Sequence, residues 1–551
     1  MKKIKDIALL VAVVPAMLLS SCSKEYLDRT PTTALDTNLV LNNTDLIPST
    51  VVGTMRMMYS SSFGGKYATV MGDIMTDMVT SVRGSNGSFK EMEEWNINQS
   101  TPDVETLYGA SFQIAASAAR TIQAAKRKLA SDSTKMTTSQ INNLKSAIAA
   151  SLTIKVYCEY FLTQFFCVDV NVGTGKYAFD NNFTMPNKEH PDRPAVGIML
   201  LKDRPLEIDE NANISSLKET YEFMEWELTE AIRYFKESGN NFFTLSGTRF
   251  YPTLCAAYMV QARVFLAQHK HREAHEAADN ALSTLPSGAS STLISDPEKM
   301  LDAYGENLSS EDIWSLNYTT QDNLSANSLQ NLFSSYGFNP SKKACDLFKK
   351  TDIRKGLHYY EKPPQKTYCL KYPNENGVFN VPIFRVPEIY MIQAEARAYD
   401  KSLGDPKESL LMVLGARDTA IGGDMAKLEA NYQVDDEHIM QTILDENARE
   451  FLCEGHRWFD LRRNGVRLTR EGTSENKLFP THFTGYPLSS FALPIPYGET
   501  STEQWKKGKG DDGKDQSGNW QNNAWDEKQG DTYSPTATIP VEGGNYDSYA
   551  H

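Results

Sequence analysis

Apolar and charged residues follow two interlocking helical patterns in residues 443–465, ILDENAREFLCEGHRWFDLRRNG. The apolar ones recur at three- and four-residue steps, which places them on one buried face: Ile443, Leu444, Ala448, Phe451, Leu452, Trp458 and Phe459. Between them lie acids and arginines, and Asp445 stands four residues before Arg449, a favourable order for a helical ion pair. Because nothing sets one carboxylate apart for acid/base work, we predict a partly buried structural network of Arg–carboxylate pairs.

The same periodicity predicts helices along much of the chain. Two long ones, over residues 107–129 and 141–166, are joined by a polar turn and should form an antiparallel pair. Residues 253–282 contain small residues spaced as in a tetratricopeptide hairpin where its two helices touch, namely Ala262, Ala274 and Ala281. Amphipathic helices are also predicted over residues 221–235, 384–399 and 407–417. Helical pairs therefore recur at wide intervals, with long loops inserted between them.

Residues 51–82 also follow a helical pattern, interrupted at Gly64-Gly65. Asp73 and Asp77 fall on a polar edge of the second half of this stretch. A flexible Gly/Ser loop follows, and Trp95 lies between that loop and the next helix. Three other tryptophans sit in strongly apolar patterns and are predicted to be buried in the core: Trp226, Trp314 and Trp458.

The N-terminus predicts secretion and lipid anchoring. Three lysines precede an apolar run over residues 7–19, which is too short for a membrane span and typical of a signal peptide. The run ends in Leu19-Ser20-Ser21-Cys22, which resembles a bacterial lipobox, so we expect residues 1–21 to be removed and Cys22 to be acylated. The alternative is a generic signal with an incidental cysteine. If Cys22 is acylated, residues 22–50 are the lipid tether and spacer, since two or three acyl chains anchor a protein durably.

Composition narrows the possible partners. The 551 residues are 40% hydrophobic, enough to bury a large core, and the net charge is −14. Removing residues 1–21 takes away three Lys and one Asp, which leaves −16 and argues against nucleic acid or an anionic membrane surface as partner. Six cysteines remain after Cys22, widely spaced and mostly within apolar helical stretches. They are typical of small core residues, not of a disulfide framework.

Few residues indicate catalysis or metal binding. The chain contains no GxSxG, Walker loop or dinucleotide fingerprint, so we predict no enzyme activity and no catalytic residue. His269, His271 and His275 lie in a predicted hairpin turn, and because they lack the HExxH order we interpret them as solvated histidines and not as metal ligands. Residues 511–519 resemble a calcium loop only loosely, without its closing Glu. We therefore expect no cofactor, with calcium at this loop as the alternative.

Taken in order, the motifs resemble those of the SusD/RagB family, surface-exposed outer-membrane lipoproteins of Bacteroidetes. The lipobox and CSKEYLD are followed by YEFMEWELTEAI, the tetratricopeptide-type hairpin, DIRK, FRVPEIYMIQAEA, ENAREFLCEGHRWFDLRRNG and LPIP. The resemblance runs from Cys22 to about Glu499. It implies a mainly α fold with four tetratricopeptide-like hairpins as scaffold, long irregular loop insertions and minor β structure. It also implies a SusC-like TonB-dependent transporter as partner and a nutrient-binding surface built from the inserted loops.

Two features depart from the family pattern. The family usually has Ala at the position of Pro387, which we interpret as a helix start because proline is tolerated in a first turn. Residues 51–499 would be the SusD-like domain, and residues 500–551 form a polar extension that contains Trp505, Trp520 and Trp525. Such a composition is typical of loop or disorder, although the tryptophans could add to a ligand surface.

A glycan-binding surface needs aromatic planes for the sugar C–H faces and nearby amides or guanidinium groups for the hydroxyls. Loop residues of these types are the predicted ligand contacts: Tyr67, Arg83, Trp95, Asn98, Tyr318, Asn323, Tyr336 and Phe338. The competing interpretation is packing, because aromatic residues dominate protein cores. Three functions stay open: capture of an oligo- or polysaccharide for an outer-membrane importer, capture of a peptide by the same architecture, and a tetratricopeptide-type scaffold that only bridges proteins.

Overall fold

The computed structural model describes residues 40–81, 88–170, 196–201, 214–239, 249–361, 366–372, 378–470, 483–486, 488 and 491–500. The predicted signal peptide, Cys22, Arg83 and the 501–551 part of the C-terminal extension, with its loosely calcium-like loop, lie outside these ranges. Their interpretations stay predictions.

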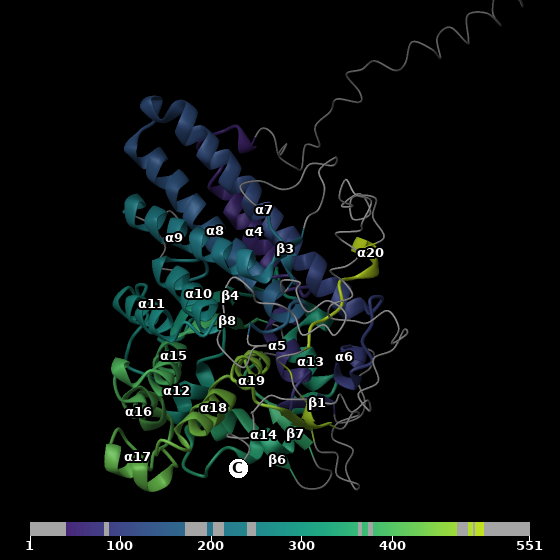
Figure 1. Ribbon diagram of the computed structural model, residues 1–551, viewed down its shortest axis with the longest axis vertical. Coiled ribbons are helices and arrows are strands. Elements are labelled where there is room, and N and C mark those ends of the chain that lie inside the picture. Colours follow the sequence, from purple (N-terminus) through teal and green to yellow (C-terminus); the bar gives the residue numbers. More distant parts are fainter. Residues whose placement is uncertain are drawn as a thin grey trace, which may run out of the picture.

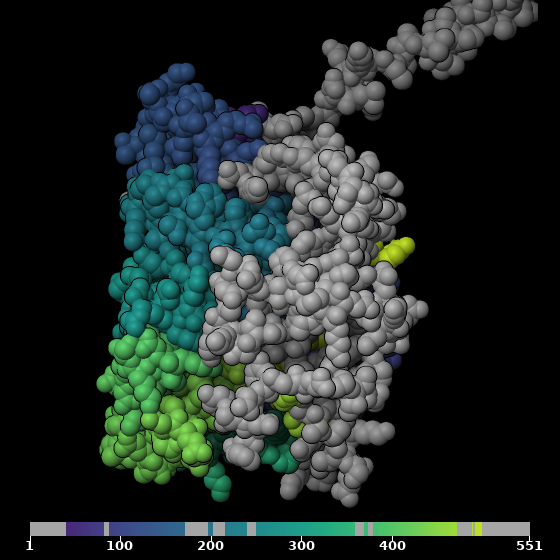
Figure 2. Space-filling model, viewed as in Figure 1, coloured from purple at the N-terminus to yellow at the C-terminus, as the bar shows by residue number. Residues whose placement is uncertain are grey.

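Long helices form a column that runs from top to bottom along the left of Figure 1. It begins with α7 (Pro102–Asp132) and α8 (Thr138–Phe166), the predicted pair of long helices. Its further members are α9 (Leu217–Ser238), α10 (Leu254–Leu266), α11 (His271–Ser283), α15 (Val386–Tyr399), α16 (Pro406–Arg417), α17 (Met425–Asn431) and α18 (Ile439–Glu450). From α7 to α17 each long helix contacts the next, and α18 contacts α15 and α16. In Figure 2 the column forms one continuous surface from blue to green.

Local sequence signals explain where these helices begin. Thr137 and Gln140 form a capping box at the start of α8, and Ser216 and Glu219 form another at the start of α9. Pro387 lies in the first turn of α15, where its missing N–H has no helical partner to lose, so the predicted helix start is confirmed.

The hairpin of α10 and α11 confirms the tetratricopeptide-type prediction. Ala262, Ala274 and Ala281 have no exposed surface, and the two helices are in contact. Small side chains at these positions let the helix backbones approach closely. With the predicted pairs α7–α8 and α15–α16, the structure is mainly α, as expected.

Shorter elements complete the fold; some lie among the helices of the column, and others lie to its right in Figure 1. The helices are α4 (Ser49–Met58), α5 (Tyr67–Ile74), α6 (Lys90–Glu94), α12 (Pro297–Asp302), α13 (Leu329–Ser334), α14 (Lys342–Asp346), α19 (Arg457–Arg463) and α20 (Tyr497–Thr500), with 3-10 turns η1 (Ser133–Lys135), η3 (Ser325–Asn327), η4 (Ile353–Leu357) and η5 (Lys401–Leu403). The strands form antiparallel two-stranded sheets: β1 (Val79–Ser81) with β5 (Phe338–Pro340), β2 (Val196–Met199) with β3 (Ile214–Ser216), β4 (Asp312–Asn317) with β8 (Asn380–Arg385), β6 (His358–Glu361) with β7 (Lys366–Cys369), and β9 (Leu468–Arg470) with β10 (Phe483–Tyr486).

The prediction for residues 51–82 is correct in its first part and wrong at its end. Helices α4 and α5 flank the Gly64-Gly65 break, but α5 ends at Ile74 and strand β1 follows. Asp73 and Asp77 are buried and do not lie on a polar edge. Asp73 accepts hydrogen bonds from the backbone N–H groups of Gly455, at 3.0 Å, and Arg457, at 3.3 Å, and Asp77 pairs with the Arg457 guanidinium at 3.1 Å. Both acids therefore hold the turn inside residues 443–465.

Two of the three tryptophans predicted in the core are there. Trp314 and Trp458 are fully buried, but Trp226 on α9 is 45% exposed. Its ring lies on Phe223, with centroids 5.6 Å apart, and under the Lys126 ammonium group, 5.6 Å from the ring centre. The apolar face of α9 faces α8 and α10 with other residues, which leaves Trp226 at its margin. Among the described helices, none has the length and apolar character of a membrane span.

Candidate functional site

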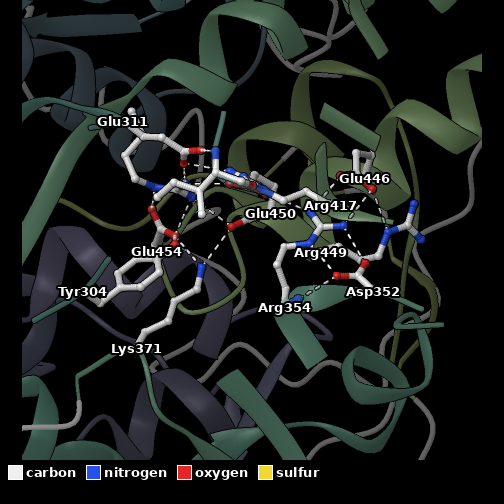
Figure 3. A network of polar contacts seen from close by, with 12 residues as sticks. Tyr304, Glu311, Asp352, Arg354, Lys371, Arg417, Glu446, Arg449, Glu450 and Glu454 are labelled. Atoms are coloured by element: carbon white, nitrogen blue, oxygen red, sulfur yellow. Dashed lines mark hydrogen bonds and ion pairs between the residues drawn. The ribbon is translucent and has the colours of Figure 1, made fainter. Parts of the chain in front are cut away.

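A buried network of ion pairs surrounds residues 443–465 (Figure 3). At its centre, the Glu450 carboxylate is 1% exposed and accepts hydrogen bonds from three guanidinium groups. Arg385 and Arg354 contact it at 2.6 and 2.8 Å, and Arg417 contacts both oxygens at 3.0 Å. Burial alone would raise the pKa of Glu450, but the three arginines outweigh it and lower the pKa well below its usual value. Glu450 is therefore charged at neutral pH and acts as a structural anion.

The remaining members balance each other's charge. Glu454 accepts from Lys371 at 2.5 Å and from Arg385 at 2.8 Å, and Arg354 forms a two-bond fork with Asp352 at 2.7 and 3.0 Å. Five cations therefore face five carboxylates: Arg354, Lys371, Arg385, Arg417 and Arg449 against Glu311, Asp352, Glu446, Glu450 and Glu454. Residues of the network lie on or next to α16, α18, β8 and η4, so their ion pairs join these elements. Because every carboxylate of the network has a cationic partner and lies away from solvent, the network offers no free acid or base. The predicted structural role of this stretch agrees with that geometry.

One predicted pair within the network is wrong. Arg449 pairs through Nε with Glu446, three residues before it, at 2.8 Å. Asp445 instead accepts from the Gln441 side chain at 2.8 Å and is partly exposed. The reason is that Glu446 points into the network, whereas Asp445 faces the edge of α18.

Three of the aromatic residues predicted to contact a ligand are buried, so that part of the prediction is wrong. Trp95 has no exposed surface, donates from Nε1 to the Met75 carbonyl at 3.0 Å and packs on Phe491, 5.0 Å between ring centres. Tyr318 is 1% exposed and donates to the Tyr59 carbonyl at 2.7 Å, and Phe338 lies in strand β5 with no exposed surface. The sequence places each of these residues near a loop, which suggested exposure, but apolar neighbours from other segments cover all three.

Four other predicted residues are partly exposed: Tyr67, Asn98, Asn323 and Tyr336. Tyr67, the first residue of α5, donates to Asp103 at 2.6 Å while its ring packs on Phe89, with centres 4.7 Å apart. Phe89 in turn packs edge-on against Phe338, two residues after Tyr336. The chain segments that carry Tyr67 and Phe338 therefore meet in space through the Phe89 ring.

The two asparagines are largely occupied by their own turns. Asn98 accepts from the Ser100 N–H at 2.8 Å in the turn before α7. Asn323 accepts from the Ser325 N–H at 3.0 Å and donates to the Thr320 carbonyl at 3.2 Å. These contacts leave part of each amide's hydrogen-bonding capacity for a ligand hydroxyl at its exposed side.

Gly64-Gly65 is what lets these segments approach each other. A Cβ on Gly65 would lie 2.5 Å from a Leu324 methyl carbon and 2.7 Å from the Tyr318 hydroxyl, and one on Gly64 would lie 2.5 Å from a Leu316 methyl carbon. Only glycine permits such contacts without displacing backbone or rings. The sequence indicated a break in the helix at Gly64-Gly65, but not which distant side chains pack against these glycines.

The sequence interpretation also missed Tyr59 and Lys66. Tyr59 is partly exposed and its ring packs on Tyr318, with centres 5.8 Å apart. Lys66 places its ammonium group 5.5 Å from the Tyr67 ring centre and 5.2 Å from that of Phe89, and it donates to Ser88 at 3.2 Å. Their positions next to Gly64-Gly65 were the available signal. We call the six partly exposed residues Tyr59, Lys66, Tyr67, Asn98, Asn323 and Tyr336 the tyrosine surface.

The surroundings of the tyrosine surface raise the pKa of Tyr67 and lower the pKa of Lys66. Burial, with Asp103 next, raises the pKa of Tyr67 above its usual value. Burial also lowers the pKa of Lys66, and Asp103 opposes that shift. The surface thus presents neutral phenols, with the Tyr67 proton donated to Asp103, and one amine beside aromatic rings, a set of groups that suits neutral polar ligands.

Two internal cavities next to residues 443–465 are too small for a sugar. They measure about 20 and 30 Å³, and Arg263, His456 and Phe459 line both. Each has room for a water molecule or two. A ligand of oligosaccharide size would therefore have to bind at the surface and not in these cavities.

The three histidines of the α10–α11 turn are not solvated, contrary to the prediction. His275 is 7% exposed and lies between Asp279, at 3.2 Å, and the Arg397 guanidinium, at 3.0 Å. His271 stacks on Tyr399 with ring centres 4.1 Å apart, and burial lowers its pKa to about 4. His269 lies 3.6 Å from Asp169. The turn packs against α15 and the end of α8, which the local sequence did not reveal.

Comparisons with known proteins agree with this architecture. The family described as the SusD family matches residues 310–542. A SusD superfamily protein from Bacteroides vulgatus shares the fold with a TM-score of 0.66 at 21% identity, over 83% of this chain and 97% of its own. One from Bacteroides thetaiotaomicron gives 0.66 at 18% identity, over 84% and 98%. A SusD-like carbohydrate binding protein from Bacteroides vulgatus gives 0.62 at 17% identity, over 78% and 86%. Among curated proteins, none matches this sequence.

The two kinds of comparison cover complementary parts of the chain. The family match contains the ion-pair network from Glu311 to Glu454 and the α15–α16 hairpin. The fold match extends over the N-terminal helices as well. Residues 310–542 therefore match the SusD family, and the chain shares the fold of SusD superfamily structures over 83% of its length.

Proposed function

We propose that this protein captures glycans at the cell surface and delivers them to a SusC-like TonB-dependent transporter in the outer membrane. Similarity to the SusD family over residues 310–542 carries the proposal. One structure that shares the fold is described as a SusD-like carbohydrate binding protein. The balanced ion network has a structural role in this proposal, since each of its carboxylates is paired with a cation and buried.

The tyrosine surface is the ligand contact in this proposal. Tyr59, Tyr67 and Tyr336 offer aromatic edges, and Lys66, Asn98 and Asn323 offer donors and acceptors around them. Aromatic residues suit the C–H faces of sugar rings, while amides and amines suit the hydroxyls. A rigid base is supplied by the buried rings of Phe89, Tyr318 and Phe338. In this proposal an oligo- or polysaccharide binds at this surface, because the two cavities next to residues 443–465 are too small for a sugar.

Glycan arrays with the purified protein test the proposal, followed by calorimetry against the strongest hit. Tyr59→Ala and Tyr336→Ala should each weaken binding about fivefold, because an aromatic contact contributes about 1 kcal/mol beyond burial. Tyr234→Ala is the matched control, since Tyr234 is a partly exposed tyrosine on the scaffold helix α9. Unchanged affinity in both surface variants would remove the tyrosine surface from the site. Binding only to peptide libraries would favour peptide capture, and capture of protein partners without any small ligand would favour a pure scaffold.

Anchoring at the membrane is a separate part of the proposal. Acylation of Cys22 would tether the protein, so Cys22→Ala should move it out of the membrane fraction in detergent partitioning. Retention of the variant in the membrane fraction would contradict the lipobox interpretation. Delivery to a transporter is tested by co-purification with a SusC-like protein expressed in the same cells, with the Cys22→Ala variant as a check that the contact does not depend on the anchor.

A further inference from the structure

Three metal-ligating side chains from distant parts of the sequence meet in the interior. His358 and Cys369 are directly opposite each other in the β6–β7 hairpin, which places both side chains on the same face of the sheet. Cys453 comes from the turn after α18, held by a hydrogen bond from the Tyr372 hydroxyl to its carbonyl at 2.9 Å. One ligand atom from each residue lies within 4.8 Å of the other two. All three residues are buried.

His358 gives an independent indication of a missing partner. It is 2% exposed, and both ring nitrogens are buried without any hydrogen-bond partner. A buried imidazole normally has at least one nitrogen satisfied, because leaving polar atoms unpaired away from water is unfavourable. Packing alone does not account for such a side chain, since its only aromatic neighbour among the described rings is Phe348, with centres 5.6 Å apart. A ligand that accepts an imidazole lone pair would satisfy it.

Cys453 also has an unusual backbone. Its φ is +66°, a left-handed conformation that residues with a Cβ rarely adopt. Such strain persists only where the surroundings enforce it, and it is enriched at functional positions. Here the left-handed conformation turns the Cys453 side chain toward the β6–β7 hairpin. Cys453 is one of the three residues between Glu450 and Glu454, two members of the ion network.

From this arrangement we propose that His358, Cys369 and Cys453 bind one Zn²⁺ ion. Two sulfurs and one imidazole nitrogen are ligands that Zn²⁺ prefers. With metal–ligand distances of about 2.0–2.3 Å, ligand atoms around zinc lie about 3.5–4 Å apart, so the observed spacing needs only a small contraction. Two thiolates also cancel the charge of a divalent ion. This matters in a buried site whose neighbour Lys371 is already paired with Glu454.

The proton balance of this binding step is defined. Two cysteine thiols and Zn²⁺ give the zinc dithiolate and two protons, and the neutral imidazole binds through its lone pair without releasing a proton. Affinity should therefore rise 100-fold for each pH unit as long as both thiols are protonated in the metal-free protein. A site made of histidines alone would lack this strong dependence at neutral pH.

The test uses the full chain, purified under reducing conditions with a chelator and then freed of both. Zn²⁺ is titrated in competition with a chromophoric chelator, and Co²⁺ serves as the spectroscopic probe. We expect one ion per chain, two protons released, and a thiolate-to-Co²⁺ charge-transfer band. Cys369→Ser, Cys453→Ser and His358→Asn should each weaken Zn²⁺ binding at least about 100-fold, since changes even outside the ligand set often cost 10–100-fold.

Cys255→Ser is the matched control. Cys255 is a buried cysteine on α10 whose thiol donates to the Ala281 carbonyl at 3.2 Å, outside the proposed site, so this variant should keep the full Zn²⁺ affinity. If a ligand variant fails to fold, the stoichiometry, proton release and Co²⁺ spectrum of the unchanged protein still decide. Binding without a charge-transfer band would place the metal on histidines such as His275 and overturn the proposal. So would a Cys369–Cys453 disulfide, found by peptide mapping after alkylation of protein isolated without reductant.

Discussion

Replacing Glu450 by Gln tests the ion network at its centre. Gln has nearly the same shape, so the change removes the charge and exchanges one acceptor oxygen for an NH₂ group. In the folded protein each carboxylate oxygen accepts from two guanidinium groups: Arg385 and Arg417 on one side, Arg354 and Arg417 on the other. The variant therefore loses two charge-assisted hydrogen bonds and sets an N–H donor against N–H donors.

The magnitude follows from the charge balance. Without Glu450, five cations face four carboxylates, which leaves one uncompensated positive charge in the interior. Removing one partner of a buried pair costs roughly 3–5 kcal/mol of unfolding free energy, and each lost charge-assisted hydrogen bond contributes about 1.5–3 kcal/mol on its own. We therefore expect a loss of about 4 kcal/mol at neutral pH.

Urea unfolding followed by circular dichroism measures this loss, with Asp445→Asn as the matched control. Asp445 lies on the same helix, carries the same charge and is partly exposed, with the Gln441 amide as its hydrogen-bond partner. Its removal should change the unfolding free energy by no more than about 0.5 kcal/mol. Equal, small losses in both variants would show that water reaches Glu450 and that the buried network does not hold these helices together.

The pH dependence gives a second check on Glu450. Its pKa is lowered well below the usual value in the folded protein, so its contribution is fully present above the pKa of an unfolded Glu, about 4.3. The contribution is lost as the pH falls below that value toward the folded pKa. The stability difference between the unchanged protein and Glu450→Gln should therefore be constant from neutral pH to about pH 5 and shrink in acid.

Three further predictions concern burial, close contact and a raised pKa. Trp95→Ala should cost about 3–5 kcal/mol of unfolding free energy, whereas the same change at the 45% exposed Trp226 should cost far less; similar urea midpoints would contradict the burial of Trp95. Gly65→Ala should cost about 1–3 kcal/mol, while Gly53→Ala, with open space around its Cβ position, should stabilise α4 by up to about 1 kcal/mol; a neutral Gly65 variant would show that the Leu324 contact is loose. Burial raises the pKa of Asp312 to about 7, so the folded state holds a proton that the unfolded state loses near pH 4, and the unfolding free energy falls between pH 4 and 7. Asp312→Asn should remove about 1.4 kcal/mol per pH unit from that fall. An unchanged slope would contradict the raised pKa.

The scaffold could be predicted from the sequence because it depends on local periodicity. The pairs α7–α8, α10–α11 and α15–α16 each show an apolar stripe, a polar turn and, for Ala262, Ala274 and Ala281, small residues at the contact. Pro387 and the capping residues mark helix starts within a few positions of the observed ones. Such signals are read from neighbours in the sequence, so they survive without knowledge of the fold.

Residues whose environment depends on distant segments were predicted less well. Trp95 follows a polar loop, which suggested exposure, but Met75, Trp458 and Phe491 enclose it from three other parts of the chain. Asp73 appeared to lie on a polar helix edge because its partners are the backbone N–H groups of Gly455 and Arg457, nearly four hundred residues away. Amphipathic periodicity shows which face of a helix is apolar, but not which buried acid a distant turn requires.

The candidate sites show the same limit in opposite ways. The sequence predicted Tyr67 and Tyr336, which are partly exposed, but also Tyr318 and Phe338, which are buried, and it missed Tyr59. It gave no signal at all for the cluster of His358, Cys369 and Cys453, whose two cysteines are 84 residues apart and show no CxxC spacing.

Only the fold brings the two cysteines of that cluster together. Arg385 and Lys371 tie the β7–β8 region to Glu450 and Glu454, and Cys453 lies in the three-residue turn between those two acids. The ion network therefore fixes the position of the Cys453 turn against the β6–β7 hairpin. If the network is loosened by Glu450→Gln, the distance between Cys453 and the pair His358–Cys369 should become less well defined, and Zn²⁺ affinity should fall although no ligand has changed. A variant that loses stability but keeps full Zn²⁺ affinity would show that the hairpin and the turn are held together independently of the network.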